Sequence, residues 1–160
     1  MENNIQILPL NQRPEFFDEV VNTYYEQWSR PHGNTRESVA YRTKHAMNDN
    51  SVPQTLIALK GDQLVGVVSL WMCDLRTRQD LYPFLAGLYV NPSCRSMGIG
   101  KMLQQEALRR AKKYGYKYLH LTTDHENYYE RTGWKLLDIA PSSGEKYTRV
   151  YQFDLSQLDG

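Results

Sequence analysis

The feature that most constrains the fold is a strand that passes through a glycine-rich turn directly into a helix. Residues 81–90 have the composition of a long strand, which Asn91-Pro92 ends. Apolar residues then recur at helical spacing over residues 99–113. At the junction, Gly98 and Gly100 would let a ligand approach the backbone without meeting a Cβ. Because a helix N-terminus offers free N–H groups and a positive dipole end, the junction is suited to phosphate oxygens.

The segments on either side predict one mixed sheet. Further strands are expected over residues 5–8, 55–59, 64–71, 116–121, 134–137 and 148–155. Helices are expected over residues 14–28, 35–46 and 127–132. This order predicts an α/β fold with a mixed sheet of six to seven strands and helices on both faces. No repeat or linker-like stretch interrupts the sequence, so we expect a single domain over residues 1–160.

Composition excludes several classes of function. The net charge of +1 offers no basic surface for nucleic acid or an anionic membrane. No apolar run approaches the roughly 20 residues of a transmembrane helix, and the N-terminus does not resemble a signal peptide, so we expect a cytoplasmic protein. Cys73 and Cys94 suggest free thiols rather than a disulfide framework. The four histidines lack metal-ligand spacing, so no metal is expected.

Several kinds of phosphate-binding loop compete for the junction. A P-loop would need glycine in place of Arg95 and serine or threonine in place of Met102. A dinucleotide-binding loop would need glycine or alanine in place of Leu103. A turn that serves the fold alone remains an alternative. The pattern that the residues do fit is Arg-x-x-Gly-x-Gly, from Arg95 to Gly100.

Two segments together resemble the GNAT acetyltransferase superfamily. The first runs from Ala86 to Leu103 and is similar to the family's coenzyme A motif. The second, Tyr129-Glu130-Arg131-Thr132-Gly133-Trp134, is similar to its Tyr-Glu-Lys-x-Gly-Phe segment. The resemblance implies a GNAT-like fold with a splayed strand pair at the coenzyme A site. It also implies that acetyl-CoA is the co-substrate of an N-acetyltransferase.

The resemblance further implies roles for particular residues. The pyrophosphate of coenzyme A would bind the loop formed by Arg95, Ser96, Met97, Gly98, Gly100 and Lys101. The backbone at Leu88 and Val90 would bind the pantetheine amides as an added strand does. A backbone N–H near Leu88 would stabilise the oxyanion, and Tyr129 would protonate the departing thiolate.

The group that accepts the proton of the amine is not given by the motif. The family often carries a carboxylate early in the strand before the loop, but Tyr82-Pro83-Phe84-Leu85 has none. Because a lysine-like amine has a pKa of about 10.4, it must lose a proton before it attacks. We expect Asp80, just before the strand, to be the leading candidate. The alternatives are loss of the proton to water and the side chains of Glu26, His32, Asp74, Asp124 and His125.

The sequence thus predicts direct transfer of an acetyl group from acetyl-CoA to a primary amine. The acceptor is a small molecule or a peptide, and we expect its pocket to be built from residues 24–45 and 71–82. Acetylation of a protein N-terminus or lysine, and acyl-CoA binding without turnover, stay as alternatives. So does a covalent acyl-enzyme on Cys94. Clustered aromatic residues in the first two helices could line the pocket or form a homodimer interface.

Overall fold

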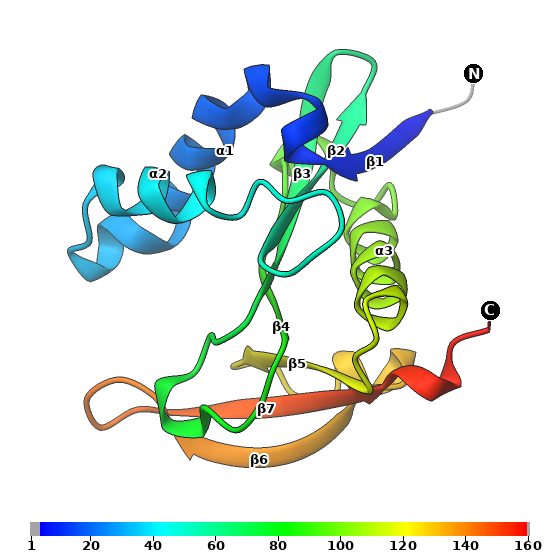
Figure 1. Ribbon diagram of the computed structural model, residues 1–160. Coiled ribbons are helices and arrows are strands. Elements are labelled where there is room, and N and C mark those ends of the chain that lie inside the picture. Colours follow the sequence, from blue (N-terminus) through cyan, green and yellow to red (C-terminus); the bar gives the residue numbers. More distant parts are fainter. Residues whose placement is uncertain (1–3, 160) are drawn as a thin grey trace.

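The structure is a computed structural model that describes residues 4–159, and its chain forms one continuous sheet with helices on both faces (Figure 1). The strands are β1 (Ile5–Pro9), β2 (Gln54–Lys60), β3 (Gln63–Trp71), β4 (Phe84–Val90), β5 (Tyr118–Thr123), β6 (Lys135–Pro141) and β7 (Tyr147–Asp154). The α-helices are α1 (Phe17–Tyr24), α2 (Arg36–Lys44) and α3 (Ile99–Lys113). A 3₁₀ turn, η7, spans Tyr129–Thr132. No helix among the described residues is long and apolar enough to cross a membrane.

The sheet has seven strands in the order β1-β2-β3-β4-β5-β7-β6. All neighbouring pairs are antiparallel except β4 and β5, which are parallel. The hairpin of β2 and β3 closes through the two residues Gly61 and Asp62, as the sequence predicts. The mixed sheet with helices on both faces is therefore confirmed.

Two hydrophobic clusters fix the helices to opposite faces of β2 and β3. On one face, Val20 and Val21 of α1 and Val39 of α2 pack against Ile57 and neighbouring strand residues. On the other, the apolar side of α3 packs against Leu56 and neighbours. Successive side chains of a strand point to opposite faces, so adjacent residues of β2 serve different clusters. Figure 1 shows α1 and α2 on one side of this part of the sheet and α3 on the other.

The first helical segment is more broken than predicted. Instead of one helix over residues 14–28, α1 follows a 3₁₀ turn and continues into a π-helical segment over Tyr25–Ser29. Pro31 lacks the N–H that would continue the helical hydrogen bonds, and a further 3₁₀ turn, Arg30–His32, follows. The wide π-helical turn ends where Trp28 and Ser29 reach a cavity, which is a common place for such turns.

The strand before the loop starts later than predicted, at Phe84 rather than Leu81. Pro83 has no N–H to offer a neighbouring strand. Its carbonyl instead accepts hydrogen bonds from the backbone N–H and from Nδ1 of His120, at 3.1 and 3.0 Å. The single residue pair that joins β4 to β5 is Phe84 with His120. Beyond that pair the two strands separate toward the end of β4.

Candidate active site

The separation of β4 and β5 is matched by an irregularity on the other edge of β4. Ser69 of β3 pairs with Ala86, but Val67 pairs with Tyr89, so β4 has an extra residue between these pairs. Gly87 takes up the bulge with a φ of +60°. Any Cβ at this position would lie 2.7 Å from the ring of Tyr24, so the bulge requires glycine. The backbone of β4 is thereby turned toward the gap.

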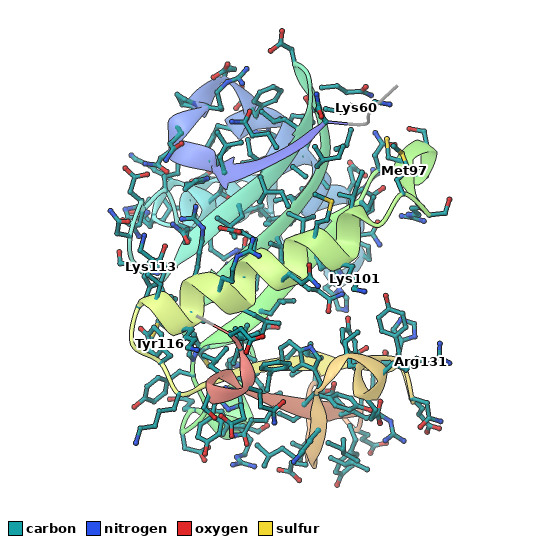
Figure 2. All side chains as sticks on the ribbon, turned by 90° about the vertical axis from the view of Figure 1, so that its right-hand side faces the viewer. Lys60, Met97, Lys101, Lys113, Tyr116 and Arg131 are labelled. Carbon is teal, nitrogen blue, oxygen red and sulfur yellow. The ribbon has the colours of Figure 1, made fainter. Side chains whose placement is uncertain are left out.

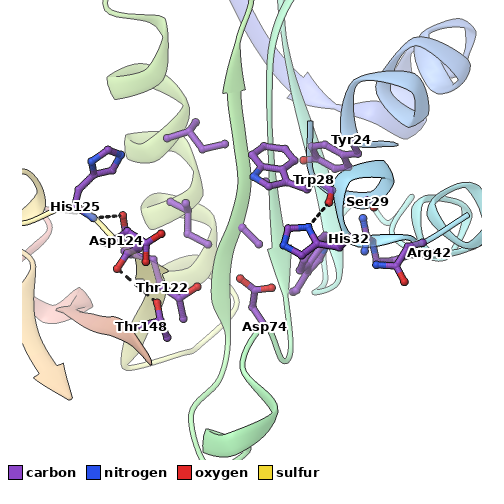
Figure 3. A pocket seen from close by; sticks show the side chains of 18 of the residues that line it. Tyr24, Trp28, Ser29, His32, Arg42, Asp74, Thr122, Asp124, His125 and Thr148 are labelled. Carbon is purple, nitrogen blue, oxygen red and sulfur yellow. Dashed lines mark hydrogen bonds between the residues drawn. The ribbon is translucent and has the colours of Figure 1, made fainter. Parts of the chain in front are cut away.

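A cavity of about 640 Å³ opens at this gap (Figure 3). Residues 85–88 of β4 and 121–123 of β5 line it at the gap. Its other walls come from the α1–α2 region and from the segments after β3 and β5. These wall residues include Tyr24, Trp28, His32, Arg42, Trp71, Asp74, Asp124, His125 and Tyr129. The expectation that residues 24–45 and 71–82 contribute a pocket agrees with these lining residues.

Asp74 follows β3 and lies at the centre of the cavity in the view of Figure 3. Its side chain is open to the solvent of the cavity but crowded by protein. The loss of hydration raises the pKa of the Asp74 carboxyl to about 6, although Arg42 and the Thr122 hydroxyl favour the charged form. Asp74 is therefore ionised at neutral pH and is a stronger base than an ordinary carboxylate.

Tyr129 enters the cavity from the 3₁₀ turn η7 on the opposite side of the gap. Its ring is held between aromatic neighbours, with Trp134 and Tyr151 at centroid distances of 6.1 and 5.9 Å. Burial raises the pKa of the Tyr129 hydroxyl, so it stays protonated at neutral pH. No hydrogen bond joins this hydroxyl to another residue within 4–159. It is thus a proton donor held beside the cavity.

The predicted phosphate loop has the geometry of an anion site. Gly98 caps α3 in the left-handed conformation with a φ of +78°. The helical ladder starts with the N–H of Met102, which donates to the Gly98 carbonyl. The N–H groups of Ile99, Gly100 and Lys101 therefore precede the ladder and point out of the helix start. No atom lies within 4 Å of where a Cβ on Gly98 would be, so the turn is open to a ligand on that side.

The charged side chains near this loop do not all point toward its backbone N–H groups. Lys101, near the start of α3, and Arg131, on η7, line a second pocket between the two segments (Figure 2). Ser96 and Met97 lie in the turn itself, where Ser96 has a φ of +73°. Arg95 does not point into the loop, because its Nε donates to the Val90 carbonyl at 3.1 Å and its guanidinium lies over Tyr89.

The structure does not bring every expected residue to the cavity. Leu88 lines it, but Val90 does not, and Val90 pairs with Gly66 of β3. Asp80 is exposed and accepts two hydrogen bonds from Arg78, each 2.9 Å long, which lowers the pKa of its carboxyl. Asp80, the expected base, therefore lies outside the cavity, and its carboxylate is a weaker base than that of Asp74. Glu26 likewise lies outside and pairs with Arg30.

The places of three residues in the candidate site could not be predicted from the spacing of residues in the sequence. Gly87 was part of the motif, but its contact with Tyr24 depends on packing between α1 and β4. Arg42 reaches the cavity from α2, a helix without a clear apolar stripe in its sequence. Arg131 lines a pocket with Lys101 only because the fold brings η7 and α3 to the two sides of that pocket. The one available signal was the position of Arg131 in the motif beside Tyr129.

A bulged strand, a splayed parallel neighbour and a helix start with free N–H groups together suit a coenzyme A-dependent acyltransferase. Comparison with protein families agrees with this class. Residues 14–134 match the Acetyltransferase (GNAT) family, and the chain belongs to this family. The protein is an acetyltransferase that uses acetyl-CoA as co-substrate. A comparison with curated proteins gave no match.

Solved structures with the same fold include acetyltransferases of small molecules. An aminoglycoside 6'-N-acetyltransferase in complex with coenzyme A is 17% identical, with 97% of this chain and 99% of that chain covered and a TM-score of 0.74. The aminoglycoside 6'-N-acetyltransferase from Enterococcus faecium is 17% identical, with the same coverage and a TM-score of 0.72. A GNAT acetyltransferase from Staphylococcus aureus Mu50 is 19% identical, covering 95% and 99%, with a TM-score of 0.67. At such identities the likeness establishes the fold alone.

Proposed function

We propose that this acetyltransferase acts on a primary amine by direct transfer, with Asp74 as the general base and Tyr129 as the general acid. Acetyl-CoA supplies the activated acetyl group. The observation that carries the proposal is the position of a carboxyl with a pKa of about 6 inside the cavity at the splayed strands. Residues 1–160 act in this proposal as one domain, because the sheet joins strands from both ends of the described chain.

The two substrates enter the cavity from different sides of the sheet. Coenzyme A binds at the start of α3, with its pyrophosphate on the loop from Arg95 to Lys101, and its pantetheine arm passes along β4 beside Leu88. The acceptor binds among the side chains of α1, α2 and the segment after β3. The two meet at the gap between β4 and β5, where proximity supplies much of the rate enhancement.

Within the gap the chain's own groups handle the protons. Asp74 accepts a proton from the acceptor amine, which frees the nitrogen lone pair for attack. The N–H groups of the bulged β4 backbone near Leu88 face the developing negative charge on the carbonyl oxygen. Tyr129 then gives its proton to the departing sulfur. Cys94 is buried and is not among the residues that line the cavity, which favours direct transfer over an acyl-enzyme.

Asp74→Asn and Asp80→Asn form a matched pair that tests the base. Asp74→Asn should lower kcat for acetylation of a primary amine about 100-fold, because the proton acceptor is lost. Asp80→Asn removes an equal charge outside the cavity and should leave kcat within about twofold. Release of coenzyme A over a panel of small amines and peptides measures both variants. Equal activity of the two variants would contradict the role of Asp74, and a preference for peptides would favour protein acetylation.

A further inference from the structure

Arg42 and Asp74 place opposite charges in the acceptor part of the cavity. Arg42 comes from α2, and its guanidinium carbon lies 4.3 Å from the ring centroid of Trp71. In the view of Figure 3, Asp74 lies between Arg42 and Thr122 of β5. All four of these residues line the cavity. The cation therefore faces the same space as the proposed base.

The Arg42 guanidinium makes no short ion pair or hydrogen bond with another described residue. Of the ion pairs among residues 4–159, none includes Arg42 or Asp74, and no other residue of this part of the chain accepts a hydrogen bond from the Arg42 guanidinium. Arg42 is exposed overall, but crowding by protein lowers the pKa of its guanidinium while the charge of Asp74 opposes this shift. The guanidinium can therefore pair with an anion that enters the cavity.

The guanidinium of Arg42 lies over the Trp71 ring, and this contact restricts its orientation. The N–H groups at the edge of a guanidinium held in this way form a fork that remains available to a ligand. This fork matches the two oxygens of a carboxylate. Arg42 and Asp74 influence each other's pKa but form no ion pair, and both line the cavity, so one ligand with both charges would face both side chains.

The negatively charged group expected to bind Arg42 does not belong to coenzyme A. The phosphate loop is at the start of α3, which packs on the opposite face of β2 and β3 from α1 and α2. Figure 1 shows this separation directly, with α2 and α3 on different sides of the sheet. The phosphates are thus bound on the far side, and the group that meets Arg42 must belong to the acceptor.

We propose that the acceptor is an amino acid-like molecule, whose carboxylate binds Arg42 while its amine is presented to Asp74. This inference rests on the proposed function and names the substrate class for the same site. A polycationic acceptor fits less well, because a second ammonium group would be brought close to Arg42. The aromatic walls formed by Trp28 and Trp71 would contact the apolar part of the molecule.

Matched acceptor pairs test the substrate class. Each amino acid is compared with the amine that lacks its carboxylate: L-phenylalanine with phenethylamine, and 4-aminobutyrate with propylamine. For at least one pair, kcat/KM of the unmodified enzyme should be about 10-fold or more higher for the amino acid. Higher kcat/KM for the plain amine in every pair would overturn the inference.

Arg42→Gln and Lys44→Gln separate binding of the carboxylate from general loss of charge. Arg42→Gln should lower kcat/KM for the preferred amino acid about 10- to 100-fold and leave the plain amine within about threefold. Lys44 is exposed on the same helix and does not line the cavity. Lys44→Gln should therefore leave kcat/KM unchanged for both the amino acid and the plain amine. Equal losses for both acceptors in folded Arg42→Gln would mean a structural role and overturn the inference. If Arg42→Gln fails to fold, Arg42→Lys serves in its place and should lose part of the preference.

The same data distinguish failure of this inference from failure of the proposed function. If plain amines are acetylated and no amino acid is preferred, the substrate class is wrong and amine acetylation stands. If neither member of any pair is acetylated, and no other primary amine is, the proposed function fails and the inference fails with it.

Discussion

At the scale of single residues, Tyr129 and Asp74 line the same cavity with protonation states that suit opposite tasks. The environment raises the pKa of both groups. For Tyr129 this keeps the proton on the hydroxyl at working pH. For Asp74 the value of about 6 leaves the carboxylate charged at neutral pH while making it a better base. Two groups of one site are thus prepared to give and to accept a proton.

Tyr129→Phe tests the acid because it keeps the ring and removes the proton. If Tyr129 protonates the leaving sulfur, kcat should fall about 100-fold, while the affinity for coenzyme A measured by calorimetry changes little. The packing of the ring on Trp134 and Tyr151 is retained in this variant. Near-normal kcat, on an acceptor whose chemical step limits the rate, would leave Tyr129 with a packing role alone.

The sequence singled out Tyr129, which lines the cavity, but favoured Asp80, which does not, over Asp74. The motif Tyr129–Trp134 is local, so its residue types could be read directly. Asp74 and Asp80 lie in one irregular segment between β3 and β4, where no periodicity says which side chain faces inward. Tertiary contacts decide which carboxylate faces the cavity. Arg78 holds Asp80 and Asp138 outside it, while Arg42 and Thr122 act on Asp74 inside it.

At the scale of elements, the start of α3 and the end of β4 were the most predictable parts. The predicted helix 99–113 has the observed bounds, because its apolar spacing and its flanking glycines all agree. The region of α1 was less predictable, since the π-helical turn over Tyr25–Ser29 keeps the helical spacing of apolar residues. The bulge at Gly87 was also hidden, because a single extra residue leaves the composition of a strand unchanged.

Gly98→Val and Gly115→Val test the phosphate loop as a matched pair at the two ends of α3. Both glycines have a positive φ, +78° and +94°, and neither position has an atom within 4 Å of a Cβ. Both variants should therefore lose stability by a similar amount, about 1–2 kcal/mol or more. Only Gly98→Val should weaken binding of coenzyme A, about 10-fold or more, because its side chain occupies the pyrophosphate position. Calorimetry showing equal affinity in both folded variants would contradict the phosphate site.

At the scale of the whole molecule, the sheet brings two separately built half-sites together. One half lies on the α3 side and follows from the local motif, which is why the sequence indicated acetyl-CoA. The other half joins α1, α2 and the segment after β3, which are distant along the chain and meet only in the folded protein. For that reason the acceptor side had to be taken from the structure. The gap between β4 and β5 is where the two halves meet.

The pH dependence of acetyl transfer tests whether the distant segments form one site. The folded segments crowd Asp74 and raise the pKa of its carboxyl. An acidic group with a raised pKa loses its proton only above about pH 6, so the base is present above that pH and is lost below it. The most direct measurement is kcat/KM of the unmodified enzyme and of Asp74→Asn, each taken from pH 5 to pH 9. We predict that kcat/KM of the unmodified enzyme rises to about pH 6 and is then constant, because ionised Asp74 takes the proton from the ammonium form of the acceptor. In Asp74→Asn only the neutral amine can attack, so kcat/KM should keep rising about 10-fold per pH unit up to the pKa of the amine. The same pH profile in both enzymes would contradict Asp74 as the base at the splayed strands.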